Sequence, residues 1–296
     1  MGFRTLFLFA FCLLVAALSA AQTSVSPTSS TDQGNRVQFG RVVDNQKKND
    51  AAQTLFERIE RVESRKVGSD APPDVKINRV IPAGAGVDKI AVGPDGKPAD
   101  PVAYRAELEK LERALVWSIE DGRPQRDAYD KLAKKQKDRA DLIDATRTAF
   151  LYTFVSSELR SDRTLLKYRM EPNPAYKPTS RMTAIYAKVR GFVWIDEIAG
   201  ELARVQVEVT DDFSVGGFLA KVYKGSHFMQ ERYEMAPGFW FPSYAQYDFD
   251  GRKLFMSFAI HERTFYSQYR RIGPPKEALA AIRAELGKPA GAPADP

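Results

Sequence analysis

Histidine is the residue best suited to acid–base catalysis near neutral pH, and this chain of 296 residues has two, His227 and His261. Ser226 precedes the first, and Glu262 follows the second. A hydrolase triad needs a histidine that contacts both a serine and a carboxylate, whereas neighbouring residues of a strand point to opposite faces of a sheet. The chain also lacks a G-x-S-x-G motif. We therefore interpret both histidines as sheet residues, and we expect no catalytic residue and no enzyme.

Two pairs of adjacent carboxylates, Asp196-Glu197 and Asp211-Asp212, are of the type that glycosidases and metal sites use. Both pairs lie in predicted turns, where solvated acidic residues are common. Gly216-Gly217 and Gly225 are not followed by a helix that begins with Lys-Ser/Thr, as a phosphate-binding loop requires. We expect no metal and no cofactor.

The predicted strands carry more apolar residues than a surface ribbon needs. The stretch VRGFVWIDEIAGELARVQVEV, Val189 to Val209, predicts a β-hairpin. A sheet with one wet face shows strict alternation of apolar and polar residues. In Phe239–Phe249 both alternating sets carry aromatic residues, and in Lys253–Tyr266 one set is wholly apolar. Part of the sheet is therefore covered on both faces. Helices on both sides, a sheet curled around an apolar ligand, and an ordinary two-sided core all remain open.

The first residues have the pattern of a secretory signal peptide over residues 1–21. Arg4 precedes an apolar run, Leu6–Leu18, and the small residues Ser19-Ala20-Ala21 suit cleavage. The alternative is an uncleaved membrane anchor, for which the run is short. Cys12, the only cysteine, lies inside the run, so we expect no lipid anchor. The mature chain then has no thiol for a disulfide, a nucleophile or a zinc site, and we expect a soluble periplasmic protein.

The composition is typical of a globular protein, with 44% hydrophobic and 28% charged residues. The formal net charge of +6 would suit anionic partners, which in a bacterial envelope are lipid headgroups and acidic proteins. A mild charge for solubility is the simpler interpretation. We expect no nucleic-acid partner, and transient contact with a membrane is compatible with the charge.

The N-terminal half combines a polar lead with short strands. Residues 22–50 are predicted to be disordered, apart from a short ordered piece at Val37–Val43. Leu55–Lys66 has the spacing of a helix, while the resemblance described below favours a strand, so both interpretations stay open. Val75–Val80 and Asp88–Val92 are predicted to be short strands.

Two helices are predicted next. Asp100-Pro101 is a helix start, with Asp100 as the N-cap and proline in the first turn. The apolar stripe of this helix consists of Leu108, Leu111, Leu115 and Ile119. The second helix, Gln125–Ala145, is dominated by charges of both signs, and we expect it to be solvated and packed along one edge.

The C-terminal half is predicted to be a meander of antiparallel strands joined by short turns. Besides the hairpin, the predicted strands are Phe150–Leu159, Thr164–Met170, Phe218–Tyr223, His227–Met235, Phe239–Phe249 and Lys253–Tyr266. Ala236-Pro237-Gly238 and Asp250-Gly251 are predicted turns, and Met182–Val189 is a predicted short helix.

The segments PNPAYKPTSR, VRGFVWIDEIAGELARVQVEV, KGSHF and ERYEMAPGFWFPSY, together with the upstream PDGKPADPVAYRAE, resemble the core of an uncharacterised bacterial exported family. That family is placed in the periplasmic lipoprotein-carrier (LolA/LolB-like) superfamily, and the resemblance covers Phe56 to Arg271. It implies a strongly curved antiparallel sheet with helices on its concave side and acyl chains bound in an apolar cavity. The charged segment 101–145 departs from the carriers, and no residue matches their lid-locking residues, so no binding residue is carried over.

The expected fold class is therefore α+β: a curved antiparallel β-sheet, forming an open half-barrel, with helices packed on the concave side and a charged helical insertion at about 101–145. The expected domain spans residues 51–272. A short helix and a disordered tail are expected over residues 273–296.

We expect an exported, non-enzymatic binding protein that holds a lipid or a lipoprotein acyl chain, with a role in outer-membrane lipoprotein or lipid transport. The apolar residues expected to line its cavity are Phe192, Trp194, Val205, Val207, Phe218, Phe228, Trp240, Tyr247, Met256 and Phe258. The expected lid helix contributes Met182, Ile185, Tyr186 and Val189. The alternative is an envelope protein-interaction or regulatory module with a filled core, whose protein partner binds the charged helix Gln125–Ala145.

Overall fold

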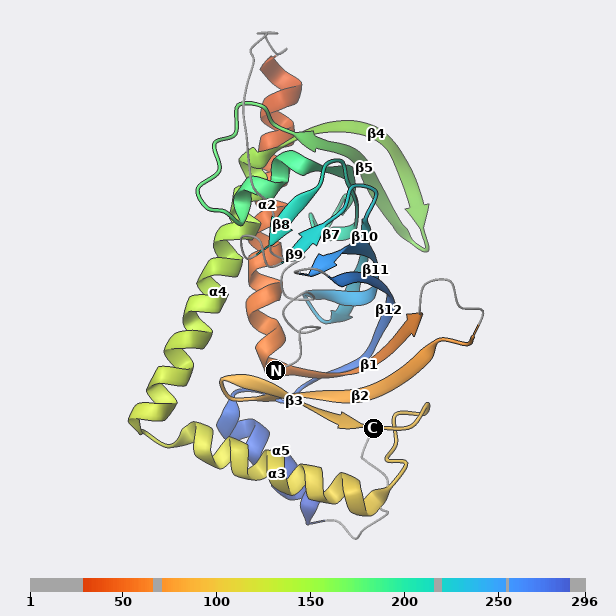
Figure 1. The fold of residues 1–296 in the computed structure, drawn as a ribbon. Helices are drawn as coiled ribbons and strands as arrows, with labels where there is room; N and C mark the ends of the chain where they lie inside the picture. The colour runs from red at the N-terminus through yellow and green to blue at the C-terminus, as the bar shows by residue number, and fades with distance from the viewer. Residues whose placement is uncertain (1–28, 66–70, 216–219, 254–255, 288–296) are drawn as a thin grey trace.

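The structure is a computed structural model, shown in Figure 1, and it describes residues 29–65, 71–215, 220–253 and 256–287. The expected signal peptide at residues 1–21 and the last part of the expected tail, residues 288–296, lie outside the described residues.

Twelve strands of the described chain form one antiparallel sheet in the order β3-β2-β1-β12-β11-β10-β7-β6-β5-β4, with β8 and β9 attached beside β11. The sheet curls but does not close, because β3 and β4 at the two ends of this order do not pair with each other (Figure 1). The expected α+β class with an open, curved antiparallel sheet is therefore confirmed.

The strands are β1 Phe56–Arg65, β2 Asp74–Ala83, β3 Gly86–Ala91, β4 Phe150–Arg160, β5 Arg163–Pro172, β6 Val189–Asp196, β7 Leu202–Val209, β8 Phe213–Val215, β9 Ala220–Val222, β10 His227–Ala236, β11 Phe239–Lys253 and β12 Met256–Arg271. The helices are α2 Ser29–Ala52, α3 Pro101–Ile119, α4 Arg123–Ala149 and α5 Pro275–Leu286, with the 3₁₀ helices η1 Gln53–Leu55 and η2 Thr183–Lys188.

The helices lie in two layers on opposite faces of the sheet (Figure 1). On the concave face, α2, η2 and α4 share one core with the sheet, in which Phe39 packs with Val193. On the other face, α3 and α5 pack Leu111 and Ile282 against Ile81 of β2. The expectation that the helices lie on the concave side therefore holds for the first layer only. The second layer is what allows β2 to bury both of its faces.

Residues 55–66, for which helix and strand were both open, contain strand β1. It pairs with β2 on one side and with β12 on the other, so it is a central strand. Charges that resemble a solvated helix face are instead neutralised inside the sheet. Arg58 Nε, for example, donates to Glu60 at 3.0 Å.

The lead over residues 22–50 was expected to be disordered apart from a short ordered piece at Val37–Val43, and its described part is the longer helix α2. Phe39, Val42 and Val43 lie at i, i+3 and i+4 and are buried. Most of the other residues of α2 are polar, and its stability comes from tertiary contacts rather than from its own sequence.

The predicted turn at Asp250-Gly251 is also absent. Both residues continue β11, and Gly251 pairs with Phe258 of β12. A Cβ at Gly251 would lie 2.2 Å from the backbone oxygen of Lys221 in β9 and 2.6 Å from the Phe258 ring, so the missing side chain permits both close pairings. The link from β11 to β12 falls at residues 254–255, outside the described residues.

The helix start at Asp100 is as predicted, because its carboxylate accepts from the backbone N–H groups of Val102 and Ala103 at 2.9 and 3.1 Å. Leu108, Leu111 and Leu115 are buried, whereas Ile119 at the end of the stripe is 38% exposed.

A buried ionic network joins the sheet to its outer helices. Arg79 of β2 donates to Glu57 of β1 at 2.7 and 2.9 Å, and to Glu285 of α5 at 2.8 and 2.9 Å. Arg270 of β12 donates to the second oxygen of Glu57 at 2.5 Å, and Tyr104 of α3 donates to Glu285 at 2.9 Å. Burial by itself would lower the pKa of Arg79, but Glu57, Tyr104 and Glu285 hold it above its ordinary value. Each charge in the network therefore depends on the others.

We predict that Arg79→Met lowers the free energy of unfolding by about 3–5 kcal/mol, because it leaves Glu57 and Glu285 without their shared buried cation. Urea denaturation followed by far-ultraviolet circular dichroism measures this loss. Arg126→Met is the control, since Arg126 pairs with Asp121 on the surface and should contribute less than about 1 kcal/mol. Equal losses in the two variants would contradict the assignment.

Candidate functional site

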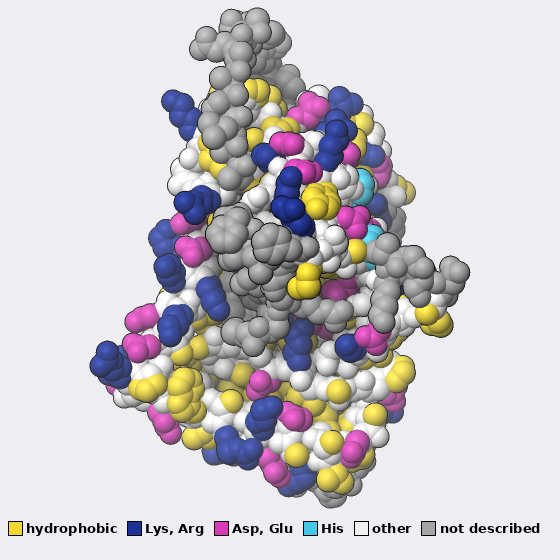
Figure 2. Space-filling view, viewed as in Figure 1, with side chains coloured by type: hydrophobic (Ala, Val, Ile, Leu, Met, Phe, Trp, Pro, Cys, Tyr) yellow, Lys and Arg dark blue, Asp and Glu magenta, His cyan; other side chains and the backbone are white. Residues whose placement is uncertain are grey.

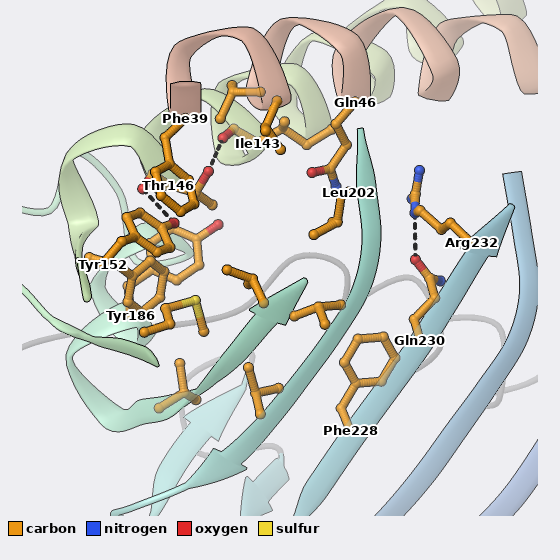
Figure 3. A pocket seen from close by; sticks show the side chains of 18 of the residues that line it. Phe39, Gln46, Ile143, Thr146, Tyr152, Tyr186, Leu202, Phe228, Gln230 and Arg232 are labelled. Atoms are coloured by element: carbon orange, nitrogen blue, oxygen red, sulfur yellow. Dashed lines mark hydrogen bonds between the residues drawn. The ribbon is translucent and has the colours of Figure 1, made fainter. Parts of the chain in front are cut away.

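Helices α2 and α4 meet the concave face of the sheet around a cavity of about 170 Å³ (Figure 3). Most of its wall is apolar, and it draws on both helices, on η2 and on five strands. The lining residues are Phe39, Val42, Val43, Gln46, Arg139, Ile143, Thr146, Phe150, Tyr152, Met170, Tyr186, Val189, Val193, Leu202, Val205, Val207, Phe228, Gln230 and Arg232.

The register of β6, β7 and β10 brings three of the expected ligand-binding residues to this wall. Val205 lies opposite Val193 and Gln230, and Val207 lies opposite Phe228. Residues paired directly across a sheet share a face, so these side chains point together toward the helices. Val205, Val207 and Phe228 all line the cavity.

Phe192, Trp194 and Trp240 lie on the opposite face of the sheet. Side chains alternate along β6, so Val193 faces the cavity while its neighbours face away. Trp194 and Trp240 are buried in a small core with Leu165, against which Phe192 packs. We call these four residues the outer aromatic cluster. This cluster explains why the hairpin is apolar on both faces.

Polar groups surround Trp194 in the outer aromatic cluster. Its indole Nε1 donates to Glu158 at 2.9 Å. Lys167 Nζ and Arg204 Cζ lie 4.9 and 4.7 Å from its ring centroids, within the range of a cation–π contact. The side chain of Trp194 therefore packs and forms its hydrogen bond on the outer face of the sheet, and it does not line the cavity.

Three further expected ligand-binding residues, Tyr247, Met256 and Phe258, do not line the cavity. Tyr247 is buried in the concave core, and Phe258 packs against that core. Met256, at the start of β12, is 70% exposed. Phe218 lies outside the described residues.

The expected lid corresponds to η2 and the first residue of β6. Tyr186 and Val189 line the cavity. Ile185 is fully buried, and Met182 packs against the concave core. The helix is therefore part of the wall and of the core at the same time.

Sequence reasoning missed the contributions of α2 and α4. Phe39 stacks on Tyr152 with ring centroids 3.7 Å apart, and it meets Tyr168 edge-on at 5.1 Å. The ordered piece predicted at Val37–Val43 contains Phe39, Val42 and Val43, but the polar composition around it predicted disorder and concealed a helix that covers the sheet.

One end of the cavity is aromatic, and its phenols are satisfied. The Tyr152 hydroxyl donates to the Thr146 carbonyl at 3.1 Å, and Tyr186 donates to the Leu142 carbonyl at 3.0 Å. Burial raises the pKa of Tyr152 above its ordinary value, so the hydroxyl stays protonated. The side chains at this end, Phe39, Tyr152 and Tyr186, are all uncharged.

The other end is polar. Gln230 and Arg232 of β10 are only 7% and 3% exposed. The Arg232 Nε donates to the Gln230 side-chain oxygen at 3.0 Å, and Figure 3 shows this pair on the far side of the cavity from Tyr152. Arg139 of α4 also lines the cavity and forms an ion pair with Asp50 of α2.

Helix α2 is fastened over the cavity by its polar side chains. Asn45 donates to the carbonyls of Ala199 and Gly200 at 3.3 and 3.0 Å, in the turn between β6 and β7. Asn49 donates to the Glu201 carboxylate at 2.8 Å and accepts from the Trp240 backbone N–H at 3.2 Å. The helix can therefore cover an apolar wall although few of its own residues are apolar.

The two carboxylate pairs take part in turn contacts. Asp196 accepts from the backbone N–H of Ala199 at 2.7 Å. Asp211 pairs with Lys188 at 2.9 Å, and Asp212 pairs with Lys221 at 2.8 Å. Among the described residues, no group of three His, Cys, Asp or Glu side chains is arranged to hold a metal ion.

The two histidines lie on the outer face of the sheet, where both pair across the strands with Asp248. His261 Nδ1 is 3.0 Å from an oxygen of Asp248, which also accepts from Arg263 at 2.9 Å. The Ser226 hydroxyl instead donates to the Asp250 carbonyl at 3.4 Å. His227, Asp248 and His261 are therefore polar neighbours on adjacent strands, and Ser226 does not contact either histidine in the way that a catalytic triad requires.

In the described part of the chain, no helix has both the length and the apolar character needed to cross a membrane.

No protein-family model matches the chain, and no curated protein matches it. It is similar to the crystal structure of LolA superfamily protein NE2245 from Nitrosomonas europaea, with 9% identity and a TM-score of 0.33 over 81% of this chain and 96% of that one. It is also similar to a putative outer membrane lipoprotein-sorting protein domain from Vibrio parahaemolyticus, with 9% identity and a TM-score of 0.32 over 84% of this chain and 100% of that one. The first is named as a member of the LolA superfamily, and the second is named for outer membrane lipoprotein sorting. At these scores, neither supports an argument about what the chain binds.

Glu201, which accepts a hydrogen bond from Asn49 of α2, predicts that the stability of the protein depends on pH. Burial raises the pKa of Glu201 to about 6, and the hydrogen bond from Asn49 only partly opposes this effect. The folded protein therefore holds a proton that the unfolded chain releases near pH 4.5. Stability from this group is complete below that pH and is lost as the pH rises through about 6.

We predict that Glu201→Gln removes the fall in stability above about pH 6. The free energy of unfolding of the variant should exceed that of the wild type by about 2 kcal/mol at pH 7. The two proteins should converge below pH 4.5. Urea denaturation at a series of pH values measures the difference, with Glu107→Gln on exposed α3 as the control. A difference between the variant and the wild type that does not change with pH would refute the assignment.

Proposed function

We propose that the chain is an exported, non-enzymatic binding protein that holds the acyl chain of a lipid or of an acylated protein. The observation that carries this proposal is the apolar cavity between the concave face of the sheet and the helices α2 and α4. The signal-peptide pattern at residues 1–21 supports export to the periplasm, and an acyl carrier there would serve lipoprotein or lipid transport.

The size of the cavity sets what it can hold without rearrangement. A dry cavity of about 150 Å³ accommodates benzene, so about 170 Å³ has room for roughly six to eight carbons. Each buried methylene contributes about 0.8 kcal/mol, which gives such a chain about 5–6 kcal/mol before the cost of ordering it. The expected dissociation constant for a short chain is on the order of 1 mM or somewhat lower.

A longer acyl chain requires a cover that moves, and α2 and the expected lid, residues 182–189, are the two segments that could provide it. Displacement of α2 would break the hydrogen bonds of Asn45 and Lys48 to backbone carbonyls, which water can replace at small net cost. It would also expose Phe39 and Val42, which are 6% and 4% exposed, whereas displacement of η2 would expose Ile185, which is 1% exposed.

We predict that Val205→Phe weakens octanol binding by about tenfold or more, because the larger ring occupies the space of two or more ligand carbons. Isothermal titration of the full chain with octanol measures the affinity. Val87→Phe, at a valine that is 52% exposed on β3, is the matched control and should bind like the wild type.

Trp194→Phe serves as a second control, because it alters the outer aromatic cluster and leaves the cavity wall unchanged. It should retain wild-type octanol affinity. If Trp194→Phe abolished binding while Val205→Phe did not, the ligand would lie on the outer face and the proposal would fail.

Native mass spectrometry of the protein isolated from a bacterial periplasm tests the proposal on natural ligands. Added masses that match fatty acids or lipids in the wild type, reduced in Val205→Phe, are the expected result. An apo mass that does not change after incubation with lipids and octanol would instead indicate a filled core.

One observation favours the alternative, an envelope protein-interaction module. No residue of α4 from 126 to 141 is buried, and Figure 2 shows positive and negative side chains interspersed along this edge of the molecule. Lys131→Glu combined with Lys134→Glu would then abolish capture of a protein partner while octanol binding stays unchanged.

A further inference from the structure

The cavity has two chemically different ends, and this difference restricts the class of ligand (Figure 3). Phe39, Tyr152 and Tyr186 form the aromatic end, whereas Gln230 and Arg232 form the polar end. A purely apolar ligand would leave the polar end facing hydrocarbon, at a cost in desolvation. An amphiphile can match both ends at once.

The charge of the wall indicates the sign of the ligand's head. The described lining residues include two arginines, Arg139 and Arg232, and no aspartate or glutamate. Arg139 forms an ion pair with Asp50 behind the wall. A guanidinium stays charged at any physiological pH, so Arg232 keeps a positive charge on the cavity wall that disfavours an ammonium head.

Arg232 is held in a defined orientation. It is 3% exposed, its Nε donates to Gln230 at 3.0 Å, and its Nη1 donates to the Trp240 carbonyl at 3.5 Å. Arg232 also helps to lower the pKa of Glu201, but that carboxylate accepts from Asn49 and does not line the cavity. A planar guanidinium that is fixed in this way is suited to bind a carboxylate or a phosphate through two parallel hydrogen bonds.

We propose that the ligand is a single-chain amphiphile with an anionic head, whose head binds Arg232 and whose chain extends toward Phe39 and Tyr152. This inference rests on the proposed function, because it names the ligand class of the same cavity. A carboxylate, as in a fatty acid, and a phosphate, as in a single-chain phospholipid, share the required chemistry.

Isothermal titration of the full chain with octanol, octanoate, octyl phosphate and octylammonium separates these possibilities without any variant. We expect octanoate or octyl phosphate to bind about tenfold or more tightly than octanol, and octylammonium to bind more weakly than octanol. The tighter of the two anions identifies the head as carboxylate or phosphate. If neither anion binds more tightly than octanol, the inference is wrong while the proposed function stands. If none of the four binds, the proposed function itself fails.

Arg232→Met then locates the head, because it keeps much of the side-chain volume and removes the charge. Octanol should still bind, and the advantage of the anion over octanol should disappear. Arg190→Met, at an exposed arginine of β6 on the other face of the sheet, should leave the advantage intact. An anion advantage that persists in a folded Arg232→Met protein would overturn the assignment. If Arg232→Met does not fold, Arg232→Lys retains the charge and should reduce the advantage by removing the paired hydrogen bonds.

Discussion

The concave face of the sheet has to be covered, and the rest of the molecule is arranged around the helix that covers it. The inward side chains of β5, β6, β7 and β10 are mostly apolar and could not face water without a large loss of stability. Helix α2 brings only a few apolar side chains to this surface, among them Phe39 and Val42. The cavity exists because so narrow an apolar stripe, together with the end of α4, does not fill a curved sheet.

The same cover is fastened by polar contacts whose partners lie far along the chain. Asn45 and Asn49 bind the turn between β6 and β7, and Asn49 also binds the backbone of Trp240. Buried polar groups are stable only when they are satisfied, so these contacts fix the position of α2 along the sheet. The buried side chains of Phe39, Val42 and Val43 add to this attachment, so polar and apolar contacts together hold the helix over the cavity.

Buried charges in this protein lie where two layers meet. Arg79 and Glu57 join the sheet to α3 and α5, and Glu201 lies beneath α2. Arg232 differs from these because it forms part of a cavity wall. A buried ionic contact between layers specifies how the layers pack, whereas a buried cation on a cavity wall also selects what enters the cavity.

Much of the architecture could be read from local patterns. The hairpin from Val189 to Val209, the cap at Asp100 and the strands that follow the charged helix each depend on neighbouring residues, and each has a counterpart in the described part of the chain. The predicted turn at Asp250-Gly251 is a continuous strand because glycine there serves the close approach of the Lys221 backbone and the Phe258 ring rather than a reversal of the chain. The described part of the polar lead, from residue 29 on, is helical beyond the predicted ordered piece Val37–Val43, because composition does not report hydrogen bonds made about 150 residues away.

The sequence by itself determined which side chains share a face, because the two-residue period of a strand is a local property. Val205 and Val207 form one such pair and Phe192 and Trp194 form another, yet the sequence alone assigned all four residues to one cavity wall. Only the tertiary structure decided which group faces the cavity, since that depends on which layer of helices packs on which side. For the same reason the sequence could not separate Trp194 from Phe228, nor identify Arg232 as a residue of the wall. Their roles arise where β6, β10 and α2 meet, and no local pattern contains all three.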